Sequence, residues 1–335
     1  MTPAVFGLSG LGLTADEKAF FRESDPAGYI VFARNIESKD QLRSLTDELR
    51  ALHGREDLAI LIDQEGGRVQ RMTEPVWPKF PAGEVFDKLY DIAPATAIEA
   101  ARLNAQALGE SLREVGITVN CLPLLDVRQP ETVAAIGDRA MGSEPMQVAA
   151  LGRAVIDGQT RGGVASVIKH MPGHGRAIVD SHMELPKVSA SREELEIDVA
   201  PFKALSTAPM GMTAHIVYEA WDSTHCASLS PKIIDEVIRG QIGFDGLLFS
   251  DDLDMKALSG DVPTRARDVV AAGCDIALNC WGRMDEMTGI ANLLGDISDK
   301  GRARLNEAMM VTSSYEEAEM AELLSRRDAL IAAAA

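Results

Sequence analysis

Eight short and almost wholly apolar runs recur along the chain, and longer stretches with helical periodicity separate them. The runs lie at 4–9, 28–33 and 58–63 and begin again at 117, 164, 209, 245 and 274. The helical stretches include 14–24, 38–53, 99–114, 144–161, 193–206, 231–239 and 264–272. Strands that are apolar throughout are expected in a parallel sheet covered on both faces. The pattern therefore predicts repeated strand–helix units.

Eight strand–helix units fit either a closed barrel or a doubly wound open sheet. The polar residues at the ends of the runs separate these two folds. Four runs end in titratable side chains, namely Asp63, Lys169 with His170, His215 and Asp251. A closed ring brings all strand ends to one face, whereas an open sheet spreads them along an edge. We therefore predict an α/β TIM-type (β/α)8 barrel, with 1–335 as a single catalytic domain and 300–335 as a C-terminal helical extension.

Composition limits the partners of this chain. It has 335 residues, 33 basic and 51 acidic, and its net charge of −18 repels phosphate backbones and anionic lipids. We expect neither nucleic acid nor membrane as a partner.

The N-terminus has no basic segment followed by a long apolar one, which predicts a cytoplasmic protein. The four cysteines form no C-x-x-C pair and are predicted to be buried free thiols.

The segment "LIDQEGGRVQRM" at 61–72 places acids and arginines beside a glycine turn. Asp63 and Arg71 are suited to a polyol, because carboxylates accept hydroxyl protons and guanidinium groups donate to oxygens. A salt-bridged surface turn fits the same residues. The loop "AAIGDRAMG" at 134–142 presents Arg139, either as another ligand-facing donor or as a solvated surface charge.

The segment "GFDGLLFSDDLDM" at 243–255 carries three acids within four positions. Asp251 follows the apolar run directly, and we assign chemistry to this carboxylate. Asp252 or Asp254 could instead serve as the N-cap of a following helix.

The stretch "KHMPGHGRAIVDSH" at 169–182 concentrates three histidines. Zinc is disfavoured because neither H-x-H nor H-E-x-x-H is present, and a phosphate cradle would need G-x-x-x-x-G-K. Acid/base chemistry fits better, since Asp180 lies two residues before His182 and can fix its tautomer. Lys169 and His170 lie at the end of the strand. The histidine between the two pairs, His174, is expected to shape the loop.

Six ordered motifs together resemble the single-domain β-N-acetylglucosaminidases of glycoside hydrolase family 3, bacterial enzymes of peptidoglycan recycling. They are "FARN" at 32–35, "IDQEGGRVQR" at 62–71, "GDRAMG" at 137–142, "KHMPGHG" with "VDSH" at 169–182, "MTAHIVY" at 212–218 and "FSDDLDM" at 249–255. The resemblance spans nearly the whole chain. Met171 and Arg176 depart from the usual family residues.

The resemblance implies a retaining exo-β-N-acetylglucosaminidase that acts on N-acetylglucosaminyl-β-1,4-anhydro-muropeptides. Asp251 would attack the anomeric carbon, and His182, oriented by Asp180, would protonate the departing oxygen. The implied substrate-binding residues are Asp63, Arg71, Arg139, Lys169 and His170. Neither a metal nor an organic cofactor is implied, and the partner is a small carbohydrate.

Two other functions remain open at this point. One is a metal-dependent barrel hydrolase with His170, His182, His215 and Asp251 as ligands. The other is a barrel that binds sugar without catalysis. The sequence does not indicate the natural aglycone or the oligomeric state.

Overall fold

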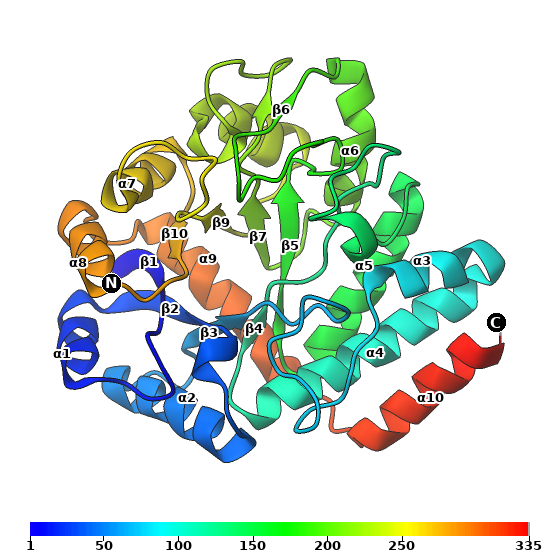
Figure 1. Ribbon diagram of the computed structural model, residues 1–335, viewed down its shortest axis with the longest axis horizontal. Helices are drawn as coiled ribbons and strands as arrows, with labels where there is room; N and C mark the ends of the chain where they lie inside the picture. The colour runs from blue at the N-terminus through cyan, green and yellow to red at the C-terminus, as the bar shows by residue number, and fades with distance from the viewer. Residues whose placement is uncertain (334–335) are drawn as a thin grey trace.

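A computed structural model describes residues 1–333 and contains a closed barrel of eight parallel strands surrounded by helices (Figure 1). The barrel strands are β1 (Thr2–Gly7), β2 (Pro26–Val31), β3 (Ala59–Ile62), β4 (Val119–Asn120), β5 (Ala165–Met171), β7 (Met210–Thr213), β9 (Leu247–Asp252) and β10 (Ile276–Asn279). Each of the eight predicted runs overlaps one of these strands. The predicted TIM-type barrel is therefore confirmed.

The ring closes between the first and the last barrel strand. Ala4 of β1 lies opposite Ala277 of β10, and Val5 of β1 lies opposite Gly28 of β2. β4 is the shortest of these strands, with two residues. Pro123 lacks an N–H group and cannot donate to a neighbouring strand, so the regular ladder stops before it, although its carbonyl still accepts from Lys169.

The apolar core has two layers. Alternate residues of each strand point into the barrel or outward toward the helices, as strand geometry requires. In β1, Val5 belongs to the barrel interior, whereas Ala4 and Phe6 belong to the layer under the helices. Both layers are buried, which explains why the strand segments are apolar throughout rather than alternating.

The barrel helices surround the strands in Figure 1. They are α1 (Ala15–Ser24), α2 (Lys39–His53), α3 (Gly83–Ile92), α4 (Pro94–Glu114), α5 (Pro145–Arg161), α6 (Arg192–Ala204), the π-helix η4 (Ile233–Gln241), α7 (Val262–Ala272) and α8 (Met284–Leu293). Short elements are β6 (Lys187–Val188) with β8 (Val217–Tyr218), and the 3-10 turns η1 (Ala33–Asn35), η2 (Gly137–Arg139), η3 (Ala227–Leu229) and η5 (Met310–Ser314). Each predicted helical stretch overlaps a helix, while α3 and α8 were not predicted.

Two further helices follow the barrel and overlap the predicted extension 300–335. In α9 (Asp299–Met309), Leu305 and Met309 pack against the residues of the barrel interior, so this helix covers the amino-terminal end of the barrel. α10 (Met320–Ala333) lies along α4 (Figure 1), and Arg327 donates to Asn104 across that contact. Residues 334 and 335 of the predicted extension lie outside the described residues.

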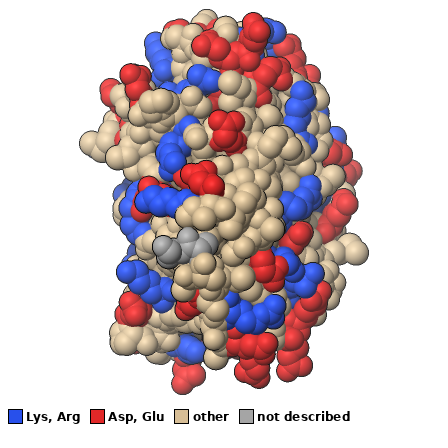
Figure 2. Space-filling view, turned by 90° about the vertical axis from the view of Figure 1, so that its right-hand side faces the viewer, with Lys and Arg blue, Asp and Glu red and all other residues tan. Residues whose placement is uncertain are grey.

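The surface carries charges of both signs. On the face shown in Figure 2, acidic and basic side chains are interspersed among uncharged ones. The four cysteines are buried and unpaired, as predicted. Within residues 1–333, no helix combines the length and the apolar character needed to span a bilayer.

Candidate active site

A cavity of about 340 Å³ opens at the carboxyl ends of the barrel strands. All eight residues that the sequence analysis assigned to the site line this cavity: Asp63, Arg71, Arg139, Lys169, His170, Asp180, His182 and Asp251. Glu65 and His174 line it as well. The closed ring therefore brings together residues that lie as far as 188 positions apart in the sequence, from Asp63 to Asp251.

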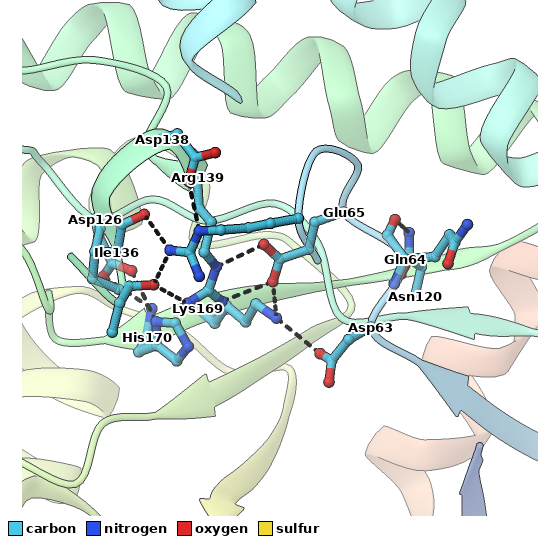
Figure 3. Close-up of polar contacts among 12 residues, drawn as sticks. Asp63, Gln64, Glu65, Asn120, Asp126, Ile136, Asp138, Arg139, Lys169 and His170 are labelled. Carbon is cyan, nitrogen blue, oxygen red and sulfur yellow. Dashed lines mark hydrogen bonds and ion pairs between the residues drawn. The ribbon is translucent and has the colours of Figure 1, made fainter. Parts of the chain in front are cut away.

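A buried ion network forms one wall of the cavity, and Figure 3 shows its side chains pointing toward one another. The Lys169 ammonium group lies 3.0 Å from Asp63 Oδ1 and 2.7 Å from Glu65 Oε1. Arg139 donates to both oxygens of Glu65 at 2.8 Å. Neither this fork nor a role for Glu65 was predicted from the sequence. Glu65 is only 5% exposed at its side chain and links two of the predicted residues.

The network holds its members in their charged forms. Burial alone raises the pKa of Asp63, but Lys169 and Arg71 outweigh burial and leave that pKa below its ordinary value. Burial acts in the same sense on Glu65, and Arg139 and Lys169 lower the pKa of this carboxyl strongly. Burial lowers the pKa of Lys169, whereas the two carboxylates raise it further, so the ammonium form is retained.

Arg71 contributes a guanidinium group whose donors are not all used. Nη2 lies 3.4 Å from Asp63 Oδ2, and the group lies over the ring of Phe32, 5.3 Å from its centroid. Nε is buried and has no hydrogen-bond partner among residues 1–333. A buried donor without a partner is costly, and this one lies in the wall of the cavity.

His170 is held by Asp126, a buried carboxylate that the sequence analysis did not assign. Asp126 Oδ2 lies 2.8 Å from Nδ1 of His170, while Oδ1 accepts from the backbone N–H groups of His170 and His174. Burial raises the pKa of Asp126, but His170 and His174 together lower it below its ordinary value, so the ionised carboxylate can only accept. Nδ1 of His170 therefore carries a proton, and Nε2 is the nitrogen left for a ligand. Asp126 follows the apolar residues "LPLL", the same signal that identified Asp63.

Asp251 is the fifth residue of β9. Its Oδ1 accepts from the backbone N–H of Asp252 at 2.8 Å. Burial raises the pKa of Asp251, but His170, His215 and the hydrogen bond from the backbone N–H of Asp252 lower it overall. The carboxylate is thus anionic at neutral pH. His215 itself lies between Ser228 and the backbone oxygen of Asp252, so it supports the end of β9.

Asp180 and His182 form a pair at the mouth of the cavity. Asp180 Oδ1 accepts from both the backbone N–H and Nδ1 of His182, at 2.9 and 2.7 Å. Burial raises the pKa of Asp180, but the two hydrogen bonds from His182 bring it below its usual value. The His182 side chain is 64% exposed, and its Nδ1 is bound to Asp180. Nε2 is therefore the ring nitrogen available to a substrate.

The rest of the loop from 171 to 182 is anchored below this pair. Burial lowers the pKa of His174 to about 4, so its ring is neutral, and Nε2 lies 3.4 Å from Ser181. Arg176, one of the two departures from the family pattern, donates to buried Asp198 of α6 at 2.6 Å. Burial raises the pKa of Asp198 to about 6 despite this partner. Arg176 therefore ties the loop to α6 and does not line the cavity.

The alternative role for Asp252 and Asp254 as helix caps is wrong. The next helix, α7, begins at Val262, and its N-cap is Asp261, whose side chain accepts from Thr264. Asp254 instead accepts from Asn279 at 2.9 Å and pairs with Arg283 at 3.1 Å. These contacts join the loop after β9 to the loop after β10.

The four residues of the metal alternative do not assemble into one site. His170 pairs with Asp126, His182 with Asp180, and His215 with Ser228. Within residues 1–333, no three histidine, cysteine or acidic side chains are grouped closely enough to hold a metal ion.

Comparison with known proteins places this geometry in one family. Residues 11–312 match the model of the glycosyl hydrolase family 3 N-terminal domain. The β-hexosaminidase of Alkalilimnicola ehrlichii is 40% identical over 283 residues, which cover 83% of this chain and 80% of that protein. The β-hexosaminidase of Neisseria gonorrhoeae is 40% identical over 286 residues, covering 83% and 78%.

Solved structures agree. The crystal structure of NagZ from Neisseria gonorrhoeae in complex with N-trifluoroacetyl-D-glucosamine has a TM-score of 0.87 at 32% identity, covering 100% of this chain and 98% of that one. The same protein in complex with zinc ion gives 0.86 at 31% identity, with the same coverage. The chain therefore belongs to glycoside hydrolase family 3 and is a glycoside hydrolase of the β-N-acetylhexosaminidase type.

Proposed function

We propose that this enzyme is a retaining exo-β-N-acetylglucosaminidase that works through a covalent glycosyl-aspartate intermediate. One observation carries the proposal: an anionic Asp251 and the Asp180–His182 pair line the same cavity as a preformed polar network. A nucleophile, a proton donor and a set of sugar ligands are the three parts that this reaction needs.

In the first step, a carboxylate oxygen of Asp251 attacks the anomeric carbon, and the bond from that carbon to the glycosidic oxygen breaks. Protonated His182 gives its Nε2 proton to the departing oxygen, and Asp180 stabilises the imidazolium form beforehand. His182 takes the place of the second carboxylate that most retaining glycosidases use.

In the second step, water attacks the anomeric carbon, and neutral His182 accepts its proton at Nε2. The bond between the sugar and Asp251 breaks, N-acetylglucosamine leaves, and both groups return to their starting state. The lowered pKa of Asp251 favours this step, because a stable carboxylate is a good leaving group.

The terminal sugar is proposed to bind Asp63, Arg71, Arg139, Lys169 and His170. Three features support this assignment. Asp63 supplies carboxylate oxygens for hydroxyl groups, Arg71 has an unused buried donor at Nε, and His170 presents Nε2. Charged partners fix all of these side chains before the substrate arrives, so little ordering is needed on binding.

The natural substrates are proposed to be N-acetylglucosaminyl-β-1,4-anhydro-muropeptides from peptidoglycan. Similarity to NagZ, which has been crystallised with an N-acylated glucosamine, supports the sugar, and the family motifs support the peptidoglycan fragment. We further propose that residues 1–335 act as one catalytic domain, since every proposed catalytic residue lies on the barrel. The cytoplasmic location expected from the sequence stays a prediction.

The test uses Asp251→Ala and His182→Ala with two substrates, an N-acetylglucosaminyl disaccharide and the 4-nitrophenyl glycoside. We expect Asp251→Ala to abolish turnover of both. His182→Ala should lose far more activity on the disaccharide, because nitrophenolate leaves without a proton. Equal losses on both substrates would refute the acid/base role of His182. Labelling by a 2-deoxy-2-fluoro glycoside at any residue other than Asp251 would refute the nucleophile.

The two other functions are tested with the same substrates. A zinc-containing crystal of the related NagZ makes the metal-dependent alternative worth testing directly. We expect EDTA to leave the rate unchanged, whereas a metal-dependent hydrolase would lose its activity. A barrel that only binds sugar would show no turnover under either condition.

A further inference from the structure

Trp281 is an exposed aromatic residue beside the cavity. The other two tryptophans, Trp77 and Trp221, are buried, whereas Trp281 is 51% exposed. It follows β10 by two positions, and its neighbour Cys280 lines the cavity. A tryptophan ring has a large apolar surface that is usually buried in a folded protein. An exposed ring at the edge of a ligand site is therefore a candidate contact for a ligand.

Two guanidinium groups lie within cation–π distance of the Trp281 ring. The Arg34 guanidinium lies 5.8 Å from the ring centroid and the Arg283 guanidinium 5.3 Å. Both arginines are themselves anchored. Arg34 donates to the backbone oxygens of Leu8 and Cys280. Arg283 pairs with Asp254 and Glu286 at 3.1 and 2.8 Å.

The loop that carries Trp281 also packs closely. Gly282 has φ of 66°, and a side chain there would come within 2.7 Å of the backbone of Leu8. A ring that is fixed before binding costs little entropy when it meets a ligand, as a stacking platform requires.

The order of strands around the barrel places the proposed nucleophile on the strand next to the one that leads to Trp281. The residues proposed to bind the terminal sugar come from β3, β5 and the loop after β4. Asp251, which meets the anomeric carbon, lies on β9, and β10 is the next strand beyond it. Asp251 attacks the anomeric carbon from one face of the sugar, so the aglycone departs on the opposite face, on the side of the proton donor His182.

The loop that carries His182 therefore marks the side on which the aglycone lies. This loop reaches the segment after β9, where the backbone N–H of Ala257 donates to the carbonyl of Ser181 at 3.2 Å. Asp254 belongs to the same segment and pairs with Arg283 beside Trp281. The proton donor and Trp281 thus lie on adjoining loops around the exit of the cavity.

We propose that Trp281, held by Arg34 and Arg283, is the aglycone subsite of this enzyme and stacks on the second pyranose ring of the substrate. The inference rests on the proposed function, since it takes His182 to mark the departing oxygen. The aglycone class it selects is a saccharide, whose C–H face matches the apolar face of an indole.

The test compares a substrate that has a second sugar with one that has none. N,N′-diacetylchitobiose carries a second pyranose, and N-acetyl-β-D-glucosaminyl fluoride reports on the sugar pocket and Asp251 alone. Trp281→Ala should lose about tenfold in kcat/KM on the disaccharide, about 1.4 kcal/mol, mainly through KM. Its rate on the fluoride should stay within about twofold of the wild type, and Trp281→Phe should keep most of the activity on both.

Leu293→Ala is the matched control, because Leu293 is 47% exposed at the far end of α8 and should change neither substrate. If Trp281→Ala loses nothing on the disaccharide, or loses equally on both substrates, the subsite is refuted while the proposed function stands. A wild-type enzyme inert toward both substrates refutes the proposed function and the subsite with it.

Discussion

Glu65→Gln tests whether the buried ion network is held together by the Glu65 carboxylate. Glu65 accepts three charge-assisted hydrogen bonds, one from Lys169 and two from Arg139. Oε1 takes the Lys169 ammonium and Nη2 of Arg139, and Oε2 takes Nε of Arg139. A glutamine can keep the first pair on its oxygen, but its NH2 group then faces Nε, a donor against a donor. The substitution therefore removes a charge and breaks a contact.

The magnitude follows from these three bonds. A hydrogen bond to a charged group is worth roughly 1.5–3 kcal/mol, and a neutral one roughly 0.5–1.5 kcal/mol. Weakening two bonds and losing the third gives a loss of roughly 3–6 kcal/mol. Removing one partner of a buried ion pair in other proteins costs roughly 3–5 kcal/mol of stability, which agrees with this range. We expect the free energy of unfolding to fall by about 4 kcal/mol at neutral pH.

The assay is guanidinium unfolding of wild type and variant across pH. The folded-state pKa of Glu65 is lowered, so its contribution to stability is complete above the unfolded value of about 4.3 and declines as pH falls below it. The difference between the two proteins should be constant from about pH 7.5 to 5.5. At about pH 3.5 it should be smaller by about 1.2 kcal/mol.

Glu48→Gln is the control. Glu48 pairs with Lys18 at 2.6 Å on the surface, and both side chains are more than a third exposed. That variant should change the free energy of unfolding by less than about 0.5 kcal/mol. A loss below about 1 kcal/mol in Glu65→Gln, or one that grows as pH falls, would refute the reasoning.

Two further variants test the supports of the site. Asp126→Asn turns an NH2 group toward His170 Nδ1, which reverses the tautomer and should lower kcat/KM by about 10- to 100-fold; unchanged kinetics would contradict the assignment of that proton. Arg176→Met leaves Asp198 buried without its cation. Because burial raises the folded-state pKa of Asp198 to about 6, above its unfolded value, the loss of stability should be larger at pH 8 than at pH 5, and equal losses in guanidinium unfolding would contradict this.

The barrel could be predicted because its signals are local. Apolar runs gave strand positions, and the titratable residues at their ends identified the face where the cavity opens. Position at the end of an apolar run was enough to identify four residues of the site, namely Asp63, Lys169, His170 and Asp251. Asp180 and His182 were found from their spacing, since both nitrogens of the contact belong to a residue two positions away.

The supporting residues could not be predicted with the same ease, because their roles depend on distant partners. Glu65 meets Arg139 across 74 positions, and Asp126 meets His170 across 44. Nothing in the local pattern sets such a pair apart from a solvated charge. The role of Arg176 depended likewise on where α6 places Asp198. Asp126 nevertheless carried the strand-end signal and could have been found by applying it to every run.

Closure of the barrel between β1 and β10 also sets an order of events for a newly made chain. Ala4 cannot reach its partner until Ala277 has left the ribosome, so β1 keeps one open edge through most of synthesis. Contacts this distant in sequence form slowly. In refolding, recovery of hydrolysis should therefore lag behind the formation of secondary structure. The time of that recovery should report when β1 pairs with β10.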